Sequence, residues 1–436
     1  MQTHPTTLND WLSVLETRHP KTIDLGLERV AAVKDRLGIQ FNCPVITVAG
    51  TNGKGSTCAM LDSMLSQAGF RAGLYMSPHI LDFNERARIG GDPVSDADLV
   101  ASFEAVEAAR GDISLTYFEF TTLAILRVFA ATKLDAVILE VGMGGRLDAV
   151  NVIDADVAVV TSVDIDHTEY LGKTREEIAL EKAGIFRAGK TAICSDPIPP
   201  ESLIKHAEAI GADLWLFGRD FNYVGDKQQW NYGGRTHRRG ALNYPTLRGA
   251  NQLLNASAAM AALESLRDRL PVSAQEVRNG LVLVDLPARF QVLAGMPTVV
   301  LDVAHNPHAA ATMGLSIDAM GFHKYTYAVF GAMKDKDIAG MIEQVKGRID
   351  HWCVTDLPSP RAASAELLKE KVIEGGALEP DKRCAERTVQ TFASPAEAFA
   401  NAMSRAVPES DRIVVFGSFV TVAGVMPAVR GSKNME

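Results

Sequence analysis

Residues 45–57 constrain the fold of this chain more than any other stretch. The run 45–49 is apolar and rich in β-branched residues, which predicts a buried strand. Three glycines follow between residues 50 and 55, and residues 56–68, closed by Gly69, predict a helix with a C′ glycine. A strand, a glycine loop and a helix in this order form a phosphate cradle, because loop N–H groups and the helix N-terminus point at an anion.

The loop departs from the common nucleotide-binding pattern at one position. The strict pattern requires glycine at position 48, where this chain has Val48. The alternative interpretation is an ordinary glycine-rich connection between a strand and a helix. Lys54 directly follows a glycine, and hydroxyl side chains stand at Thr51 and Ser56. Both features favour phosphate binding over that alternative.

Apolar strands alternate with amphipathic helices along most of the chain, which predicts an α/β fold with a mostly parallel sheet covered on both faces. At 436 residues the chain is too long for one ordinary core. We therefore predict a first domain over residues 1–287 and a smaller Rossmann-like domain over residues 288–436, with a junction at 286–290. Residues 220–243 predict small antiparallel hairpins. Strands are expected at 45–49, 71–76, 136–141 and 157–163 in the first domain, and at 298–303, 325–330, 350–355 and 412–416 in the second.

The composition excludes several classes of protein. Hydrophobic residues make up 47% of the chain and charged residues 22%, as in globular proteins. A net charge of −9 argues against a nucleic-acid partner. The five cysteines are scattered, without metal-type spacing, which is typical of reduced thiols. With neither a signal peptide nor a membrane span expected, we predict a cytoplasmic protein that binds neither nucleic acids nor membranes.

Polar residues follow several predicted strands of the first domain. Ligands of open parallel sheets bind at the carboxyl ends of the strands, where this sequence places Ser77, Glu140 and residues 164–167. A carboxylate at the end of a buried strand is costly unless it is paired or bound to a metal, and Mg²⁺ prefers oxygen ligands and nucleotide phosphates. Glu140 and Ser77 suit such a site, and His167 lies at the same edge. The alternatives are an ion pair for Glu140 and ordinary turn or loop roles for Ser77 and His167.

Two further segments combine flexible backbone with polar side chains. The loop 142–148 contains Arg146 and Asp148 among glycines, and predicts either a close approach of backbone to a ligand or a tight bend with a solvated arginine. Asp302 and His305 follow a strand of the second domain, and there the alternative is a helix cap at Asn306, followed by proline.

Two basic residues are also candidates. Arg289, at the predicted junction, is long enough to reach a phosphate, and its alternative is a salt bridge between the domains. Lys182 ends a predicted helix behind His167, and its alternative is a lysine that favours a helix C-terminus.

The chain carries a set of motifs that together are similar to one family. They lie at 49–57, 77–79, 83–86, 116–119, 140–149, 166–167, 181–185, 302–307 and 416–419. As a set these residues resemble the dihydrofolate synthase/folylpolyglutamate synthase enzymes of the Mur ligase group, over nearly the whole chain. The resemblance implies a P-loop domain of the Mur-ligase type followed by a Rossmann-like glutamate-ligase domain.

The resemblance also implies an activity. Such enzymes are ATP-dependent ligases that add L-glutamate to 7,8-dihydropteroate and to tetrahydrofolate polyglutamates. The pterin carboxylate attacks the γ-phosphate of ATP, and the amino group of glutamate then displaces phosphate from the acyl phosphate. The implied ligands are ATP, two Mg²⁺ ions, L-glutamate, dihydropteroate and reduced folates, and we expect a monomer.

Matching the motifs carries roles to numbered residues of this chain. The implied ATP contacts are Asn52, Gly53, Lys54, Gly55, Ser56, Asn255, Arg289 and Asp302. The implied metal ligands are Ser77, Glu140, His167 and Lys182. The implied pteroate contacts are Thr116, Tyr117, Phe118, Glu119, Leu147, Asp148 and Ala149. The implied catalytic residues are Lys54, His167, Lys182 and His305, the last on the glutamate side. The chain departs from the family pattern at Ala288, Asn251 and Val150, where glycine, histidine and threonine are usual.

Lys182 also has a physical reason to be modified. Two unit charges 4 Å apart cost about 4 kcal/mol at an effective dielectric of 20, so an ammonium beside Mg²⁺ is repelled. Carbamylation by CO₂ changes the charge from +1 to −1 and supplies two oxygen ligands. We therefore predict a carbamylated Lys182, against the alternative of an unmodified lysine in an ordinary hydrogen bond.

Three other functions compete with the ligase interpretation. A Mur-type ligase of cell-wall precursors would use the same loop, but it would usually carry an additional nucleotide-sugar domain, which is not visible before Val45. A P-loop phosphotransferase or regulatory ATPase would need only the first domain. A non-enzymatic nucleotide-binding module would not need so many polar residues at the strand ends.

Overall fold

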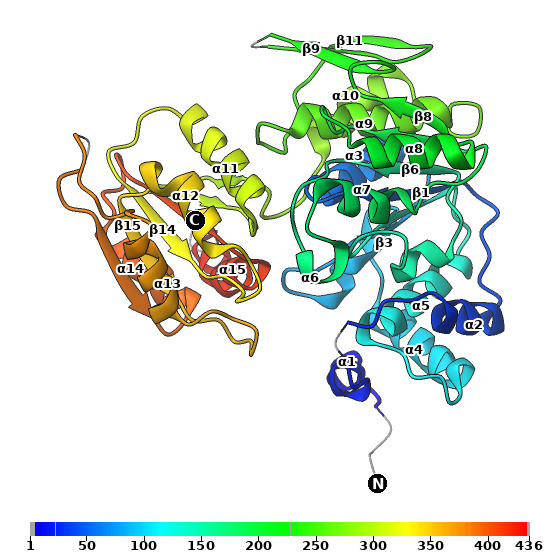
Figure 1. Cartoon of the computed structure of the whole chain (residues 1–436), viewed down its shortest axis with the longest axis horizontal. Helices are drawn as coiled ribbons and strands as arrows, with labels where there is room; N and C mark the ends of the chain where they lie inside the picture. The colour runs from blue at the N-terminus through cyan, green and yellow to red at the C-terminus, as the bar shows by residue number, and fades with distance from the viewer. Residues whose placement is uncertain (1–4, 22, 227, 383, 434–436) are drawn as a thin grey trace. The chain divides into compact units, whose positions relative to one another are not determined.

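Two units, each built around its own sheet, make up the structure, a computed structural model that describes residues 5–21, 23–226, 228–382 and 384–433 (Figure 1). The first unit comprises Met1–Thr246 and Leu253–Val284, and the second comprises Leu247–Gln252 and Asp285–Glu436. In the part of the chain that the structure describes, no helix is both long and apolar enough to cross a membrane.

The sheet of the first unit places β1 (Val45–Ala49) between β5 (Ala136–Glu140) and β6 (Val157–Val160). The other strands are β2 (Ala72–Tyr75), β3 (Ala87–Ile89), β4 (Asp92–Pro93), β7 (Thr191–Cys194) and β8 (Asp213–Leu216), in the order β4-β3-β2-β5-β1-β6-β7-β8. The six strands from β2 through β5, β1, β6 and β7 to β8 are all parallel. At the other end of the sheet, β3 pairs antiparallel with both β2 and β4. The carboxyl ends of β2, β5, β1 and β6 are therefore neighbours at one edge of the sheet.

Helices cover both faces of this sheet. They are α1 (Leu8–Arg18), α2 (Glu28–Leu37), α3 (Lys54–Gln67), α4 (Asp96–Arg110), α5 (Tyr117–Ala130), α6 (Thr168–Leu171), α7 (Arg175–Ala183), α8 (Glu201–Ile210), α9 (Gln252–Ser265) and α10 (Ala274–Leu283). Helices α1, α2, α4, α5, α7 and α8 supply one continuous apolar core. Helix α3 packs against β1, β2 and β5 and against α10, where the Ser63 hydroxyl donates to the carbonyl of Gly280 at 2.8 Å.

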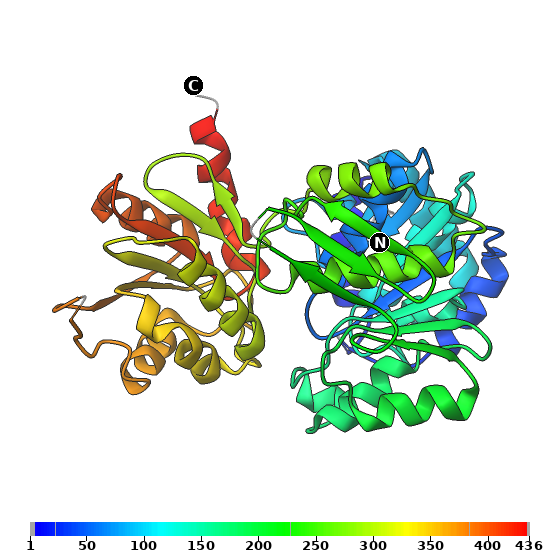
Figure 2. The same ribbon diagram turned by 90° about the horizontal axis from the view of Figure 1, so that it is seen from above.

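A separate three-stranded antiparallel sheet confirms the predicted hairpins (Figure 2). It consists of β9 (Asn222–Gly225), β10 (Trp230–Gly233) and β11 (Arg238–Leu242). The buried carboxylate of Glu264 on α9 accepts hydrogen bonds from the Tyr232 hydroxyl at 2.9 Å and the Thr236 N–H at 2.7 Å. These bonds attach the small sheet to α9.

The second unit has a six-stranded sheet in the order β12-β13-β17-β14-β15-β16. Its elements are β12 (Gln291–Leu293), β13 (Thr298–Leu301), α11 (Pro307–Ala319), β14 (Thr326–Phe330), α12 (Ile338–Val345), β15 (His351–Thr355), α13 (Ala365–Glu374), β16 (Thr388–Phe392), α14 (Pro395–Arg405), β17 (Arg412–Phe416) and α15 (Phe419–Lys433). Helices α11, α12 and α13 build one core on the sheet, while α14 and α15 contact other strand residues. All neighbouring strands except the β12–β13 pair are parallel, as expected of a Rossmann-like unit.

Several predicted boundaries were wrong. The predicted helix 56–68 begins earlier, at Lys54, because Gly53 already serves as its N-cap. The predicted strand 157–163 ends at Val160. The Thr161 N–H still bonds Ala49 at the end of β1, but the Ser162 carbonyl accepts from Thr51 of the phosphate loop and the Val163 N–H donates to Asp196. Strands β3, β4, β7, β8, β12 and β16 were not predicted. Of these, β12 and β16 lie at sheet edges and are only half buried, so their apolar pattern is weak.

Candidate active site

The loop after β1 bends so tightly that only glycine fits at one of its positions. Gly53 has a φ of 86°, and a Cβ there would lie 3.1 Å from Cγ of Asn255 and overlap its Oδ1. The Nζ of Lys54 donates to the carbonyls of Gly50 at 2.9 Å and Thr51 at 3.3 Å. The structure thus brings Asn255, from α9, against the loop that contains the predicted residues 52–56.

Glu140 and Ser77 lie at neighbouring strand ends. The carboxylate of Glu140, which is 4% exposed, accepts a hydrogen bond from the Ser77 N–H at 3.0 Å. Glu140 pairs with Val48 in the parallel register of β1 and β5, so it lies beside the strand that leads into the phosphate loop.

His167 lies at the end of the segment that leaves β6. Its φ of 52° is in the left-handed region, and it is the N-cap residue of α6. The Asp166 carboxylate accepts the His167 N–H at 2.8 Å, and its Oδ2 lies 4.0 Å from Nε2 of the ring. A non-glycine residue in this region costs on the order of 1 kcal/mol or more, and such strain is common at functional sites.

Lys182 is buried in the last turn of α7, with 3% of the residue exposed. Burial and the charge of Lys54 lower the pKa of Lys182 to about 7, while the carboxylate of Asp166 opposes the change. The side chain is therefore close enough to Lys54 and Asp166 to feel their charges, and its ammonium form is unfavourable there.

The two predicted pteroate segments meet at Gly142. A Cβ on Gly142 would overlap the Phe118 ring, with Cζ at 2.6 Å and Cε2 at 2.9 Å, and would lie 3.2 Å from Oδ2 of Asp148. Thr116 is the N-cap of α5 and forms a capping box with Glu119. The second oxygen of Glu119 accepts from Arg29 Nη2 at 2.8 Å.

Asp148 closes the loop 142–148. Its carboxylate accepts the N–H groups of Met143 at 2.8 Å and Val150 at 3.1 Å, and burial raises its pKa to about 6. Half-buried Leu147 precedes it, and buried Ala149 begins the 3₁₀ helix η2 (Ala149–Val152). The loop is therefore shaped by its own aspartate.

Sequence reasoning assigned no role to Arg86, although it lies beside a predicted pteroate residue. Its guanidinium carbon is 5.4 Å from the ring centre of Phe83 and 5.7 Å from that of Tyr117. Its Nε donates to Nδ1 of His79 at 2.8 Å, and burial together with the Arg86 charge lowers the pKa of His79 to about 4. The available signal was the motif 83–86, which places an arginine close to an aromatic residue.

In the second unit, Arg289, Asp302 and His305 gather near Phe419. The Phe419 ring centre lies 5.1 Å from the Arg289 guanidinium and 6.1 Å from the His305 ring centre. Asp302 accepts the N–H groups of Phe290 at 2.8 Å and Ala304 at 2.7 Å, and burial raises its pKa to about 6.

Two neighbouring features of the second unit were visible in the sequence. Asn306 caps α11 by accepting the Ala309 N–H at 2.9 Å, with Pro307 next, which confirms the cap. Ala288, where the resemblance implies glycine, adopts a φ of 61°. A glycine would suit this left-handed backbone position, which this chain fills with alanine.

Comparison with known proteins matches each of the two units to a known domain family. Residues 48–263 match the Mur ligase middle domain, and residues 288–419 match the Mur ligase glutamate ligase domain. The dihydrofolate synthase/folylpolyglutamate synthase of Escherichia coli K12 is 44% identical over 428 residues, which cover 98% of this chain and 96% of that protein. The chain belongs to the dihydrofolate synthase/folylpolyglutamate synthase family.

Solved structures agree with this family assignment. Escherichia coli FolC in complex with DHPP and ADP has a TM-score of 0.91 and 43% identity, covering 98% of this chain and 99% of that one. A bifunctional folylpolyglutamate synthase/dihydrofolate synthase with Mn, AMPPNP and L-glutamate bound has a TM-score of 0.88 and 42% identity, covering 98% of both chains. The expected α/β fold with Mur-ligase-type units is therefore confirmed.

That family member contains a divalent metal ion. The residues of this chain suit such an ion if a nucleotide supplies some of its ligands. Ser77 and Glu140 offer oxygen atoms beside the phosphate loop, and His167 offers an imidazole. Across the residues that the structure describes, no group of three or more His, Cys, Asp or Glu side chains is arranged to hold a metal. Mg²⁺ usually combines one or two carboxylates with phosphates and water, so the donor set suits an ion held jointly with a nucleotide.

Proposed function

We propose that this protein is an ATP-dependent ligase that joins L-glutamate through an amide bond to 7,8-dihydropteroate and to tetrahydrofolate and its polyglutamates. The observation that carries the proposal is the arrangement around Lys54. Lys54 bonds its own glycine loop, the paired Ser77 and Glu140 lie at the ends of strands beside the one that leads into this loop, and buried Lys182 is close enough to Lys54 to feel its charge. The bifunctional relatives support the two pterin substrates.

The reaction needs two transfers. A carboxylate oxygen of the pterin substrate attacks the γ-phosphorus, the bond from that phosphorus to the bridging oxygen breaks, and ADP leaves. The glutamate amine then attacks the acyl carbon, loses a proton and displaces phosphate. Loop N–H groups and Lys54 stabilise the charge on the transferring group. A bound divalent ion supplies additional positive charge at the phosphates, and Ser77, Glu140 and His167 would hold it.

The remaining predicted residues are assigned by unit. We assign ATP and pterin binding to the first unit, with Asn255 at the phosphate loop and the segments 116–119 and 147–149 at the pteroate. We assign further ATP contacts to Arg289 and Asp302, and the glutamate side to His305. Their clustering within the second unit supports this assignment.

Carbamylation of Lys182 and a second metal ion belong to the same proposal. A buried amine beside Lys54 favours its neutral form, and the neutral amine is the form that attacks CO₂. The nitrogen–carbon bond forms as the amine loses a proton, and the product carries two oxygen ligands for a metal. Incubation with ¹³C-bicarbonate and Mg²⁺ should give a carbamate carbon signal that Lys182→Ala removes. An identical signal in the variant would contradict the modification.

Phosphate release from ATP tests the ligase function. We expect release only when L-glutamate is present together with dihydropteroate or a reduced folate, and the two pterins are assayed separately. Release with UDP-linked muropeptides instead would overturn the proposal in favour of a cell-wall ligase. Light scattering tests the predicted monomer, and the cytoplasmic location stays a prediction.

A further inference from the structure

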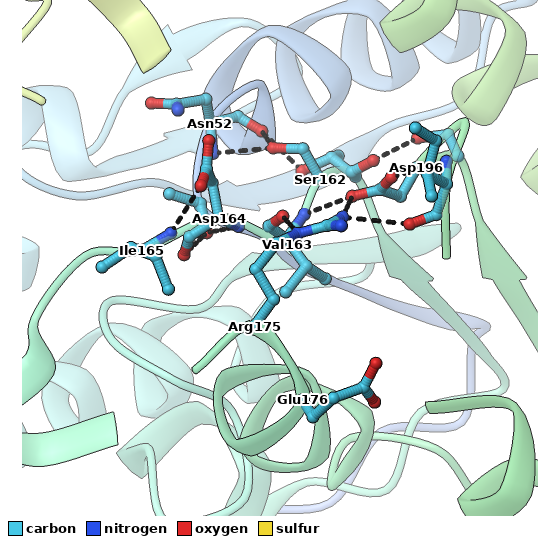
Figure 3. Close-up of polar contacts among 12 residues, drawn as sticks. Asn52, Ser162, Val163, Asp164, Ile165, Arg175, Glu176 and Asp196 are labelled. Atoms are coloured by element: carbon cyan, nitrogen blue, oxygen red, sulfur yellow. Dashed lines mark hydrogen bonds and ion pairs between the residues drawn. The ribbon is translucent and has the colours of Figure 1, made fainter. Parts of the chain in front are cut away.

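The segment that leads from β6 to His167 is bonded to the phosphate loop through its backbone (Figure 3). The Thr51 N–H donates to the Ser162 carbonyl at 2.7 Å, and the Thr51 hydroxyl accepts the Asp164 N–H at 2.9 Å. The Asn52 N–H donates to the Ser162 hydroxyl at 3.1 Å. Any shift of this segment therefore also shifts the loop that contains the predicted ATP residues.

The peptide groups of Val163 are bonded to a different part of the unit. The carboxylate of Asp196, which follows β7, accepts the Val163 N–H at 2.7 Å. Arg175 donates from Nε to the Val163 carbonyl at 2.8 Å, and from Nη2 to Asp196 at 3.1 Å and to the Ile198 carbonyl at 3.0 Å. One ion pair thus bonds both the N–H and the C=O of a residue that lies four positions before His167.

Arg175 also belongs to the helix that carries Lys182. It is the first residue of α7, after the N-cap Thr174, and Lys182 lies about two turns further along. The start of α7 is fixed to α8, because the Glu176 carboxylate accepts the Ser202 N–H at 2.8 Å and the Glu176 carbonyl accepts the Ser202 hydroxyl at 2.7 Å. The Arg175–Asp196 pair therefore connects the phosphate loop, the His167 segment and the Lys182 helix.

We propose that Arg175 and Asp196 are positioning residues that set the places of His167 and Lys182 relative to the phosphate loop. The inference rests on the proposed function for the roles of His167 and Lys182. The pair acts through the Val163 peptide. Groups hydrogen-bonded directly to a metal ligand typically contribute ten- to a hundred-fold to metal affinity, and we expect the lower end of this range for a pair that acts on His167 through the backbone.

Mn²⁺ binding in the presence of AMPPNP, followed by the electron paramagnetic resonance signal of unbound Mn²⁺, tests the proposal without turnover. Arg175→Ala and Asp196→Asn should raise the Mn²⁺ dissociation constant by about ten-fold or more. The Mn²⁺ dissociation constant of Arg175→Lys should lie between those of these variants and that of the wild type, because one ammonium cannot reproduce the guanidinium's bonds to both Val163 and Ile198. If Arg175→Ala does not fold, Arg175→Lys still tests the proposal. A folded lysine variant with intermediate Mn²⁺ affinity indicates positioning and not a loss of folding.

Arg235 provides a matched control. Like Arg175, it bonds three acceptors, here the carboxylates of Asp213 and Asp220 and the carbonyl of Leu214, and its side chain is 30% exposed against 36% for Arg175. It lies in the small antiparallel sheet region, so Arg235→Ala should lower the melting temperature without changing the Mn²⁺ dissociation constant or kcat.

The outcomes separate the two proposals. If Arg175→Ala and Asp196→Asn bind Mn²⁺ within two-fold of wild type, or if Arg235→Ala weakens binding equally, the positioning role is wrong. If the wild type fails to ligate glutamate but the Arg175 and Asp196 variants still lose Mn²⁺ affinity, the positioning role stands and the ligase proposal fails. A wild type that binds no Mn²⁺ with AMPPNP would overturn both.

Discussion

Gly50→Ala should distort the phosphate loop because the position has no room for a side chain. A Cβ on Gly50 would overlap Oγ1 of Thr161 and lie 3.1 Å from its Cβ and 3.2 Å from the Ser162 nitrogen. Thr161 is 1% exposed, and its hydroxyl donates to the Asn52 carbonyl at 2.6 Å. The threonine must therefore move and lose this bond, or the loop must shift away from β6.

Three contributions make up the expected loss of unfolding free energy in Gly50→Ala. Overpacking a buried site costs about 1–3 kcal/mol, and losing the hydroxyl bond costs about 1 kcal/mol. The φ of 152° at Gly50 adds about 1–2 kcal/mol for any L-residue. Gly69 is the matched control, because its φ is 80° and a Cβ there would meet nothing within 4 Å. We expect Gly69→Ala to cost about 1–2 kcal/mol and Gly50→Ala about 3–6 kcal/mol of unfolding free energy.

Urea unfolding followed by tryptophan fluorescence measures both variants, and phosphate release measures the effect on ATP use. Gly50→Ala should also raise the KM for ATP, whereas Gly69→Ala should not. In a Thr161→Ala background, the Gly50→Ala cost should shrink by about 1 kcal/mol or more, because the overlapping hydroxyl is gone. Equal costs for Gly50→Ala and Gly69→Ala, or no coupling to Thr161, would refute the steric reasoning.

Three further changes test the site. Lys54→Ala should lower kcat for ligation at least about a hundred-fold by removing charge at the phosphate. It should also lower the free energy of unfolding by about 1–3 kcal/mol because Nζ bonds two loop carbonyls. A variant with wild-type kcat would contradict the assignment of the phosphate loop. Asp148→Ala should raise the KM for dihydropteroate about ten-fold or more relative to that for ATP by releasing the loop that Asp148 closes, so equal effects on both substrates would argue against a pterin role. For Lys182, the folded pKa of about 7 lies below the ordinary lysine value of 10.5, so the unfolded chain binds more protons between these two pH values. Without metal or CO₂, stability should therefore rise with pH above 7 by up to about 1.4 kcal/mol per unit, and Lys182→Met should remove this slope in urea titrations at several pH values.

The sequence predicted those parts of the structure whose signal is local. The phosphate loop, the parallel strands around it and the three-stranded sheet follow from periodicity and glycine placement within short windows. The end of β6 was predicted wrongly because residues 161–163 look like strand residues. The Ser162 carbonyl accepts from Thr51 of the phosphate loop and the Val163 N–H donates to Asp196, and both partners lie far away along the chain.

The same reason explains why sequence reasoning missed two ion pairs. Arg175 and Asp196 are 21 positions apart, and Arg29 and Glu119 are 90 apart. Arg29, Arg175 and Asp196 carry no periodic or motif signal, and the motif that contains Glu119 says nothing of its partner Arg29. The edge strands β12 and β16 were missed for a related reason, since half-buried edge strands carry few apolar residues.

For three acidic residues, the family motifs imply contacts with ligands, yet both carboxylate oxygens of each accept hydrogen bonds from other groups of this chain. Glu119 accepts from the Thr116 N–H and from Arg29, while Asp148 and Asp302 each accept two backbone N–H groups. A motif records only that a carboxylate is required at a position. Here the carboxylates hold backbone groups next to Phe118 and Arg289, so we expect their replacement to affect ligand binding through loop shape. Asp148→Asn distinguishes the two roles, because an amide keeps one acceptor for the loop but turns an N–H₂ group toward the other backbone donor. If loop shape is the role, the asparagine variant should lose dihydropteroate affinity and stability together; a loss of affinity at unchanged stability would instead indicate direct contact with the pterin.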